Sequence, residues 1–276
     1  MAQAEAKTDK TLDLFAVRSL LFLPASNPRA IARARDSAAD LVVLDLEDAV
    51  RREDKDSARD AAVEAVSADW AIPVAIRVNG VGSEWHSLDL DAVARSGADL
   101  VVVPRAVSAH LVHGVAEAVD KPALVMIETA AGVLAASEIA SEAAALITGT
   151  NDLRADLHLP LDATREPISA SLQWIVLSAR AAGIPVFDGV FNKLDDGEGF
   201  LAEAQEGRRL GFDGKSLIHP NQIEQCHRAF APGEAEVERA RALVDAFRGG
   251  AERLGDEMIE RMHVDAAQRV LARAAH

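Results

Sequence analysis

Carboxylate side chains follow two apolar runs of this 276-residue sequence. Residues 124–127 run directly into Glu128, and residues 146–148 are followed after a short interval by Asp152. Short apolar runs of this kind are typical of buried parallel strands. Carboxylates at the ends of two neighbouring strands can share one hard cation. These two residues are therefore the first candidates for chemistry.

Other polar side chains repeat this pattern. The apolar run 41–44 is followed by an acidic stretch, the run 74–76 by Arg77 and Asn79, and the run 101–103 by Arg105. Side chains two residues apart on a strand share a face, so Asp45 is predicted to face the same way as Glu47, and Arg77 the same way as Asn79. A solvated loop start explains any one of these groups, but their repetition at successive strand ends favours a site.

Eight apolar runs alternate with helix-like segments along the chain. Eight alternations favour an α/β fold of the (β/α)₈ TIM-barrel type, in which the carboxyl ends of all strands share one face. Turn residues such as Gly97, Gly183 and Gly211 precede three of the runs. The expected strands cover residues 19–24, 41–46, 74–78, 99–103, 123–127, 145–148, 185–187 and 213–218.

The composition favours a small-molecule partner. Aromatic residues make up 4% of the chain and tyrosine is absent, so the core must be built mainly from Val, Leu, Ile and Ala. The formal net charge of -15 disfavours binding to nucleic acid or to an anionic membrane surface. No apolar stretch approaches membrane-spanning length, and the single cysteine, Cys226, excludes an internal disulfide. We therefore expect neither a nucleic acid nor a membrane as partner.

Three parts are predicted along the chain. Residues 1–17 lack the apolar centre of a signal peptide, so we expect a flexible N-terminus on a cytoplasmic protein. Residues 18–231 are expected to form the TIM-barrel catalytic domain. Residues 232–276 are strongly charged and are expected to form a helical extension, a lid or an oligomer contact, with helices at 234–247 and 256–274.

Six segments carry a resemblance to a known family: Arg18–Pro24, Asp45–Val50, Arg77–Asn79, Ile127–Thr129, Gly149–Leu153 and Gly214–Pro220. Together they resemble the citrate lyase β-subunit-like branch of the HpcH/HpaI aldolase family. The resemblance implies a TIM barrel with a Mg²⁺ site. It also implies reversible cleavage of a 3-hydroxyacyl-CoA, such as malyl-CoA, citramalyl-CoA or citryl-CoA, into an acyl-CoA and a 2-oxo acid. A homotrimer or a dimer of trimers is the expected assembly.

The resemblance also implies roles for individual residues. Glu128 and Asp152 resemble the metal ligands, and Arg77 resembles the cation beside the oxo-acid oxygen. A guanidinium suits that position because it stabilises negative charge without losing its proton. Asp45, Glu47 and Asp48 are expected to form the acidic cluster of the pocket. Of these, Glu47 and Asp48 are candidates for holding metal-bound water.

Two departures from the family pattern bear on the site. The family often has Pro-Lys where this chain has Pro104 and Arg105. The arginine keeps the positive charge at a position that is expected to contact substrate. The family commonly carries a lid sequence whose aspartate reaches a neighbouring subunit's site. The matching stretch here is Gly255–Ile259, in which the aspartate, Asp256, is displaced by one residue. Asp256 is the expected counterpart and a candidate catalytic residue.

Several alternatives remain open at this stage. Lys215, predicted to point inward on the last strand, is a candidate for a Schiff base in a metal-free mechanism. Arg18 is a candidate contact for CoA phosphates, although a solvated arginine explains it equally well. Hydrolysis of the same thioester is the first alternative to carbon–carbon cleavage. The second is a non-catalytic subunit that assembles with acyl-carrier partners.

Overall fold

The structure is a computed structural model that describes residues 12–274. Internal contacts divide the chain into two units, Met1–Cys226 and His227–His276, and each is described by itself. The boundary therefore lies at Cys226, a few residues before the expected one at 231.

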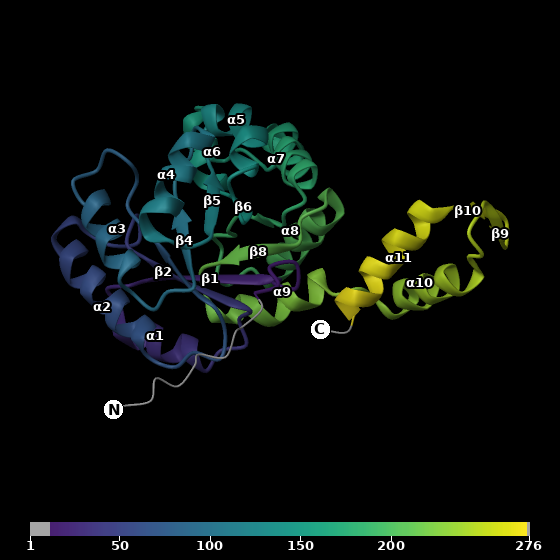
Figure 1. Cartoon of the computed structure of the whole chain (residues 1–276), viewed down its shortest axis with the longest axis horizontal. Coiled ribbons are helices and arrows are strands. Elements are labelled where there is room, and N and C mark those ends of the chain that lie inside the picture. Colours follow the sequence, from purple (N-terminus) through teal and green to yellow (C-terminus); the bar gives the residue numbers. More distant parts are fainter. Residues whose placement is uncertain (1–11, 275–276) are drawn as a thin grey trace. The chain divides into compact units, whose positions relative to one another are not determined.

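Eight parallel strands of the first unit close into a barrel in the order β1 to β8 (Figure 1). This confirms the predicted TIM barrel, and every strand begins and ends within one residue of the range expected from the sequence. The strands are β1 Ser19–Pro24, β2 Leu41–Asp45, β3 Val74–Arg77, β4 Leu100–Val103, β5 Ala123–Ile127, β6 Ala145–Thr148, β7 Val186–Asp188 and β8 Gly214–Leu217.

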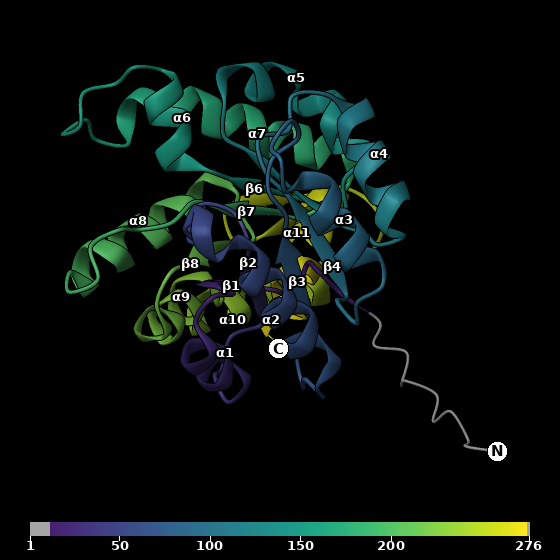
Figure 2. The same ribbon diagram turned by 90° about the vertical axis from the view of Figure 1, so that its left-hand side faces the viewer.

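Helices connect the strands and surround them (Figure 2). Side-chain caps begin several of these helices; Thr129, for example, accepts a hydrogen bond from the backbone of Gly132 at the start of α5. Within residues 12–274 no helix is both long enough and apolar enough to cross a membrane. The helices are α1 Pro28–Arg35, α2 Lys55–Ser67, α3 His86–Ala94, α4 Ala109–Val119, α5 Ala130–Ala140, α6 Thr150–Asp156, α7 Ser169–Ala182, α8 Gly197–Leu210 and α9 Ile223–Phe230, with short 3-10 turns η1 Arg52–Asp54, η2 Glu166–Ile168 and η3 Pro220–Gln222.

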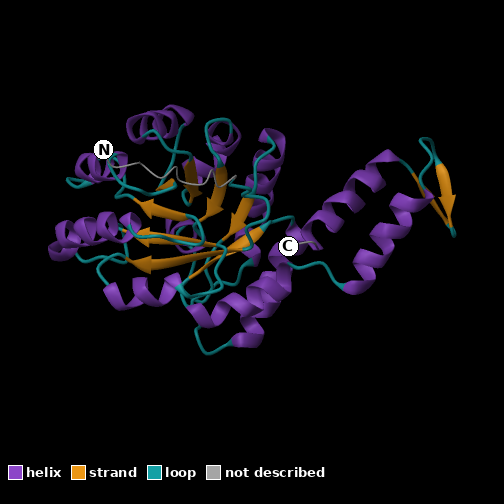
Figure 3. Ribbon diagram, turned by 60° about the horizontal axis from the view of Figure 1, so that its bottom comes forward, coloured by secondary structure: helices purple, strands orange, loops and turns teal. Residues whose placement is uncertain are grey.

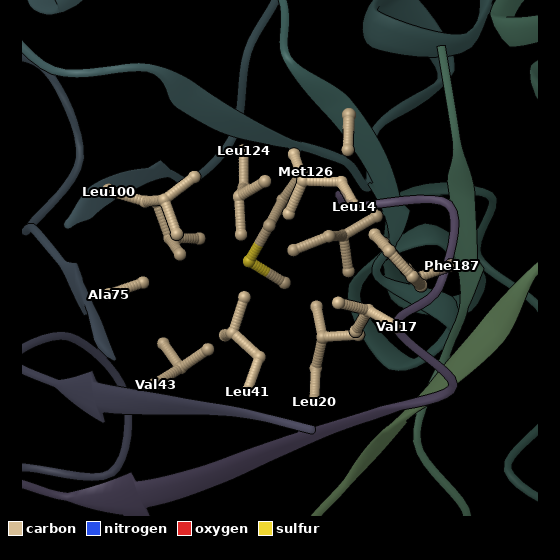
Figure 4. Packing of buried hydrophobic residues seen from close by; sticks show 13 residues of the cluster. Leu14, Val17, Leu20, Leu41, Val43, Ala75, Leu100, Leu124, Met126 and Phe187 are labelled. Carbon is tan, nitrogen blue, oxygen red and sulfur yellow. The ribbon is translucent and has the colours of Figure 1, made fainter. Parts of the chain in front are cut away.

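Aliphatic side chains at alternate strand positions fill the barrel interior (Figure 4). Leu14 and Val17 belong to the same core, with exposures of 8% and 5%. The expected flexible N-terminus at 1–17 is therefore wrong for these two residues, because burying their side chains holds this stretch against the barrel. Residues 1–11 of that prediction lie outside the described part of the chain.

Cys226 and Arg18 meet near the amino-terminal end of β1. The Cys226 thiol is fully buried and donates to the Arg18 carbonyl at 3.2 Å. Burial raises the pKa of this thiol to about 12, so it packs as a small apolar group.

The second unit is a pair of helices with a β-hairpin at its tip (Figure 3). Helix α10 spans Glu234–Ala246 and α11 spans Arg261–Ala274, and the two pack together. Between them β9 (Glu252–Leu254) pairs antiparallel with β10 (Glu257–Ile259). The predicted second helix at 256–274 is thus wrong at its start, since residues 252–259 form a hairpin instead.

Candidate active site at the carboxyl ends of the strands

A cavity of about 380 Å³ lies at the carboxyl ends of the barrel strands. One wall is apolar, with Phe22 and Pro24 from β1 and Ile218 after β8, and Met126 of β5 also lines it. Polar groups line the rest. They are Asp45, Asp48, Arg77, Thr148, Thr150, Asn151, Asp152, Asn192 and Ser216.

Arg77 is held in this cavity by two carboxylates. Strand register places it beside Asp45, and its Nε and Nη2 donate to the two oxygens of Asp45 at 2.7 and 2.6 Å. Its Nη1 lies 2.9 Å from Glu47 Oε2. Burial alone would lower the pKa of Arg77, but these carboxylates outweigh burial and raise it above the usual value. Arg77 is therefore a permanent cation with a fixed orientation.

Asp45 is saturated by protein groups. Besides the two Arg77 donors, its oxygens accept from the backbone N–H groups of Glu47 and Ala49 at 2.8 and 3.1 Å. Four accepted hydrogen bonds use the usual capacity of a carboxylate. The geometry therefore makes Asp45 a holder of Arg77.

Glu47 has a perturbed acidity. Burial raises its pKa to about 8, and the nearby carboxylates of Asp48 and Glu128 add to this effect while Arg77 opposes it. Its Oε2 is buried and accepts no hydrogen bond of good geometry from any residue between 12 and 274. A carboxyl group of this kind can take up and return a proton near neutral pH.

Glu128 directly follows β5, and only one of its two carboxylate oxygens accepts a hydrogen bond from the described residues. Its Oε1 accepts from the backbone N–H of Arg105 at 2.6 Å, and Arg105 adopts a left-handed backbone with φ of 49°. Its Oε2 is buried without a hydrogen-bond partner in the described chain. Burial raises the pKa of Glu128 to about 7, against the hydrogen bond from Arg105. An unpaired buried carboxylate oxygen is costly, which marks a position for a cation.

Gly149 makes room for Glu128. A Cβ at position 149 would lie 2.3 Å from Glu128 Oε2 and 2.4 Å from Glu128 Cβ, so only glycine permits this approach. Asp152 follows on the first turn of α6, where Arg105 Nη1 lies 3.7 Å from its Oδ1. Burial and the nearby Asp48 raise the pKa of Asp152.

These features fit a Mg²⁺ ion held by Glu128 and Asp152. Within residues 12–274 no group of three or more His, Cys, Asp or Glu side chains is arranged as a metal site. A two-carboxylate site suits Mg²⁺, because this ion keeps several water ligands and exchanges them for substrate oxygens. The orphaned oxygen of Glu128 and the space left by Gly149 support the same assignment.

Lys55 and Asp89 hold the segments that follow β2 and β3 next to the site. The sequence analysis did not identify either residue. The Lys55 ammonium donates to the carbonyls of Leu46 and Glu47 and to Asn79 Oδ1, each at 2.6 Å. Asp89 accepts from both nitrogens of Asn79 at 2.8 and 2.7 Å. Contacts to backbone carbonyls have no sequence signature, and Lys55 resembles any polar residue on an amphipathic helix.

Lys215 does not point into the cavity. It is fully buried between β8 and α8, where its Nζ lies 3.0 Å from Asp188 Oδ2 and 2.8 Å from Glu203 Oε1. Its neighbour Ser216 lines the cavity instead. The Schiff-base alternative is therefore wrong, because adjacent strand residues face opposite sides of the barrel wall and Lys215 faces the helices.

Two further predicted site residues lie elsewhere. Arg18 precedes the first residue of β1, at the opposite end of the barrel from the cavity, where its Nε lies 3.6 Å from Asp40. Its predicted contact with substrate phosphates is therefore contradicted within this chain. Asp256 occupies the two-residue turn of the β9–β10 hairpin beside Gly255, whose φ is 64°, and not a helix terminus.

Comparison with known proteins decides the family. The sequence matches the HpcH/HpaI aldolase/citrate lyase family over residues 18–220. The chain belongs to this family. It is 39% identical over 269 residues to a (3S)-malyl-CoA thioesterase of Cereibacter sphaeroides, an alignment that covers 93% of this chain and 94% of that protein. It is 38% identical to the citrate lyase subunit beta of Haemophilus influenzae, with 93% and 96% covered.

A solved structure of a citrate lyase β-like protein shares the whole fold. Protein CitE from Mycobacterium tuberculosis, in complex with magnesium, acetoacetate and coenzyme A, superposes with a TM-score of 0.84 and 31% identity. The superposition covers 95% of this chain and 100% of that one. The β subunit of citrate lyase from the same organism, complexed with oxaloacetate and magnesium, has a TM-score of 0.72, 32% identity and coverage of 80% and 100%. The chain thus lies in the citrate lyase β-like branch of an aldolase and lyase family. The two solved relatives are complexes with magnesium and an oxo acid, one of them also with coenzyme A.

Proposed function

We propose that the protein is a Mg²⁺-dependent lyase that cleaves a 3-hydroxyacyl-CoA of the malyl-CoA, citramalyl-CoA or citryl-CoA type. The observation that carries the proposal is a buried Arg77, fixed by Asp45, that lines one cavity with Asp152. Behind Gly149 of the same cavity lies Glu128, whose Oε2 has no hydrogen-bond partner among the described residues. Glu128 and Asp152 would hold the ion. When bound, Mg²⁺ supplies charge that polarises the oxygens of the oxo-acid part.

The chain's own groups account for the proton transfers. Cleavage requires removal of the 3-hydroxyl proton. The bond between C2 and C3 then breaks, its electron pair moves to the acyl-CoA as an enolate, and C3 becomes the carbonyl carbon of the 2-oxo acid. Glu47, with its raised pKa and its position beside Arg77, is the proposed acceptor of the hydroxyl proton. Arg77 stabilises the negative charge on the reacting oxygen. Return of the proton held by Glu47 to the enolate carbon balances the reaction and releases the acyl-CoA.

Hydrolysis of the thioester is the second candidate. The name of the Cereibacter sphaeroides relative favours it, and the same cavity can hold the same substrate. Hydrolysis and cleavage differ in products, because hydrolysis releases free CoA and the intact 3-hydroxy acid.

A panel of CoA esters tests both candidates. We expect malyl-, citramalyl- or citryl-CoA to give a 2-oxo acid and an acyl-CoA with Mg²⁺ present, and no product after chelation. Oxo-acid dehydrogenase coupling and chromatography of the CoA products measure the two outcomes separately. Formation of the hydroxy acid and free CoA alone would assign the thioesterase function, and no turnover of any ester would overturn both.

A further inference from the structure

Lys55 connects the segments that follow β2 and β3, and it does not line the cavity that contains Arg77. It lies in the first turn of α2, and its side chain reaches back to the loop after β2. The three acceptors of its ammonium are Leu46 O and Glu47 O on this loop and Asn79 Oδ1 after β3, each 2.6 Å away. An ammonium has three N–H donors, and all three are used. Lys55 therefore acts as a cationic link and has no free lone pair with which to act as a base.

The far end of this link is fixed as well. Asn79 donates its side-chain N–H to Asp89 at 2.7 Å, which orients its oxygen toward Lys55. Asp89 in turn accepts from Arg59 Nε of α2 at 2.7 Å. Lys55, Asn79, Asp89 and Arg59 are all less than one-tenth exposed. The loop after β2 is thereby tied to α2 and α3 through buried, charge-assisted contacts.

The supported loop carries Glu47, whose contact with Arg77 is an ion pair without a well-formed hydrogen bond. The two groups lie 2.9 Å apart, but Glu47 Oε2 accepts no well-formed hydrogen bond from the described residues. The placement of this carboxylate against Arg77 therefore depends also on where the backbone of Glu47 lies. Lys55 holds that backbone at the carbonyls on either side of the Cα of Glu47.

We propose that Lys55 is a positioning residue that sets the placement of Glu47 against Arg77. The expected loss of kcat without Lys55 rests on the proposed function. The expected loosening of the loop after β2 does not. Proton transfer depends steeply on the placement of the accepting carboxylate, and a misplacement of 1 Å can cost on the order of 100-fold in rate. Loss of Lys55 would also leave Leu46 O and Asn79 Oδ1 without this donor, whereas Glu47 O would keep only its hydrogen bond from the backbone N–H of Val50 at 3.0 Å.

A second cavity makes a rescue experiment possible. It has a volume of about 420 Å³, and Lys55 lines it together with Glu47, Asn79, Ser83 and Trp85. The Lys55 ammonium lies 5.2 Å from the Trp85 ring centroid. A small alkylammonium can therefore enter the space of a truncated side chain and find both the acceptors and the aromatic face.

The kinetic test compares Lys55→Ala with Lys121→Ala. Lys121 is partly exposed just after α4, and among the described residues its side chain makes one hydrogen bond, 3.3 Å to Ser96 O, so it is a matched control. For Lys55→Ala we expect kcat to fall about 100-fold, with KM for the CoA ester changed less than about 3-fold. Propylammonium should restore part of kcat, whereas propanol, of the same size without charge, should not. A wild-type kcat in Lys55→Ala would overturn the inference.

Hydrogen exchange gives a readout that needs no turnover. The backbone N–H groups of Glu47 and Ala49 donate to Asp45, and in Lys55→Ala we expect their exchange to accelerate at least about 10-fold while the remaining barrel keeps its wild-type rates. Faster exchange throughout the barrel would mean a general stabilising role and would overturn the inference, as would unchanged exchange at 46–50. A wild-type protein that turns over no CoA ester would refute the proposed function while exchange still decides the role of Lys55.

Lys55→Arg covers the case in which Lys55→Ala does not fold. Arginine keeps the positive charge, but its planar donor fork cannot reach three acceptors arranged around one nitrogen. We expect a folded protein with a similar loss of kcat and with faster exchange at 46–50. Wild-type kcat and exchange in Lys55→Arg would show that charge alone suffices, which contradicts a positioning role.

Discussion

At the scale of single residues, the guanidinium of Arg77 combines a fixed orientation with a permanent charge. We expect Arg77→Lys to lower kcat at least about 100-fold, because a lysine cannot donate to both oxygens of Asp45 and still face the substrate. Steady-state kinetics measures this, and circular dichroism checks that the variant is folded. A kcat within about 3-fold of wild type would remove Arg77 from the proposed chemistry.

The raised carboxyl pKa values of Glu47 and Glu128 make stability depend on pH. The folded protein holds protons on Glu128 up to about pH 7 and on Glu47 up to about pH 8, whereas both have a pKa near 4.5 without the fold. Between these limits the folded state binds more protons than the unfolded state, so stability should fall as pH rises. Mg²⁺ favours the ionised carboxylates, so it should reverse the loss at high pH. Urea unfolding from about pH 5 to pH 8.5, with chelator or with Mg²⁺, measures both effects, and a metal-free stability that rises over this range would contradict the assignment.

The sequence predicted some of these residues and not others for physical reasons. Asp45 and Arg77 were expected at neighbouring strand ends, and the register places them side by side. Lys215 was placed on the wrong face because a short strand of mixed polarity does not reveal which alternate set points inward, and a shift of one residue exchanges the faces. Lys55 could not be recognised, since its partners are mainly backbone oxygens.

At the scale of elements, close approach of β5 and β6 at their carboxyl ends requires glycine. We expect Gly149→Ala to cost about 1–3 kcal/mol and to weaken Mg²⁺ binding, because the new methyl group would lie 2.3 Å from Glu128 Oε2. Gly114→Ala on the exposed face of α4 is the control. Beyond the helix's own backbone, no atom of the described residues lies within 4 Å of a Cβ there, so it should be neutral or stabilise by up to about 1 kcal/mol. Equal Mg²⁺ affinities of the two variants in calorimetry would argue against a metal site at Glu128.

Strand positions were predictable because buried parallel strands are continuous apolar runs, and eight of them leave few alternatives to a barrel. The hairpin at 252–259 was not, because its strands have three residues each and carry charged side chains that also suit a helix. Gly255 supplied the one local signal, as a glycine that permits the tight turn between β9 and β10.

At the scale of the whole molecule, the second unit is a candidate lid that carries Asp256 to a neighbouring subunit. We expect a homotrimer or a dimer of trimers in which a Glu128→Ala chain and a chain ending at residue 231 restore activity to each other when mixed. The first supplies an intact C-terminal unit, and the second supplies an intact barrel. Native mass spectrometry confirms that mixed oligomers form. Mixed oligomers without recovered activity would place any action of the C-terminal unit within its own chain.

The burial of Cys226 has a practical consequence for deciding between the two candidate reactions. A chromogenic thiol reagent added to the assay detects a thiol only if that thiol is accessible and ionised, and the protein's single cysteine is neither. Colour in the assay therefore reports free CoA and nothing from the enzyme, even when the enzyme is present at substrate-like concentration. A single turnover can thus be followed without a correction for enzyme thiol, and a blank without enzyme then distinguishes a slow thioesterase reaction from no reaction.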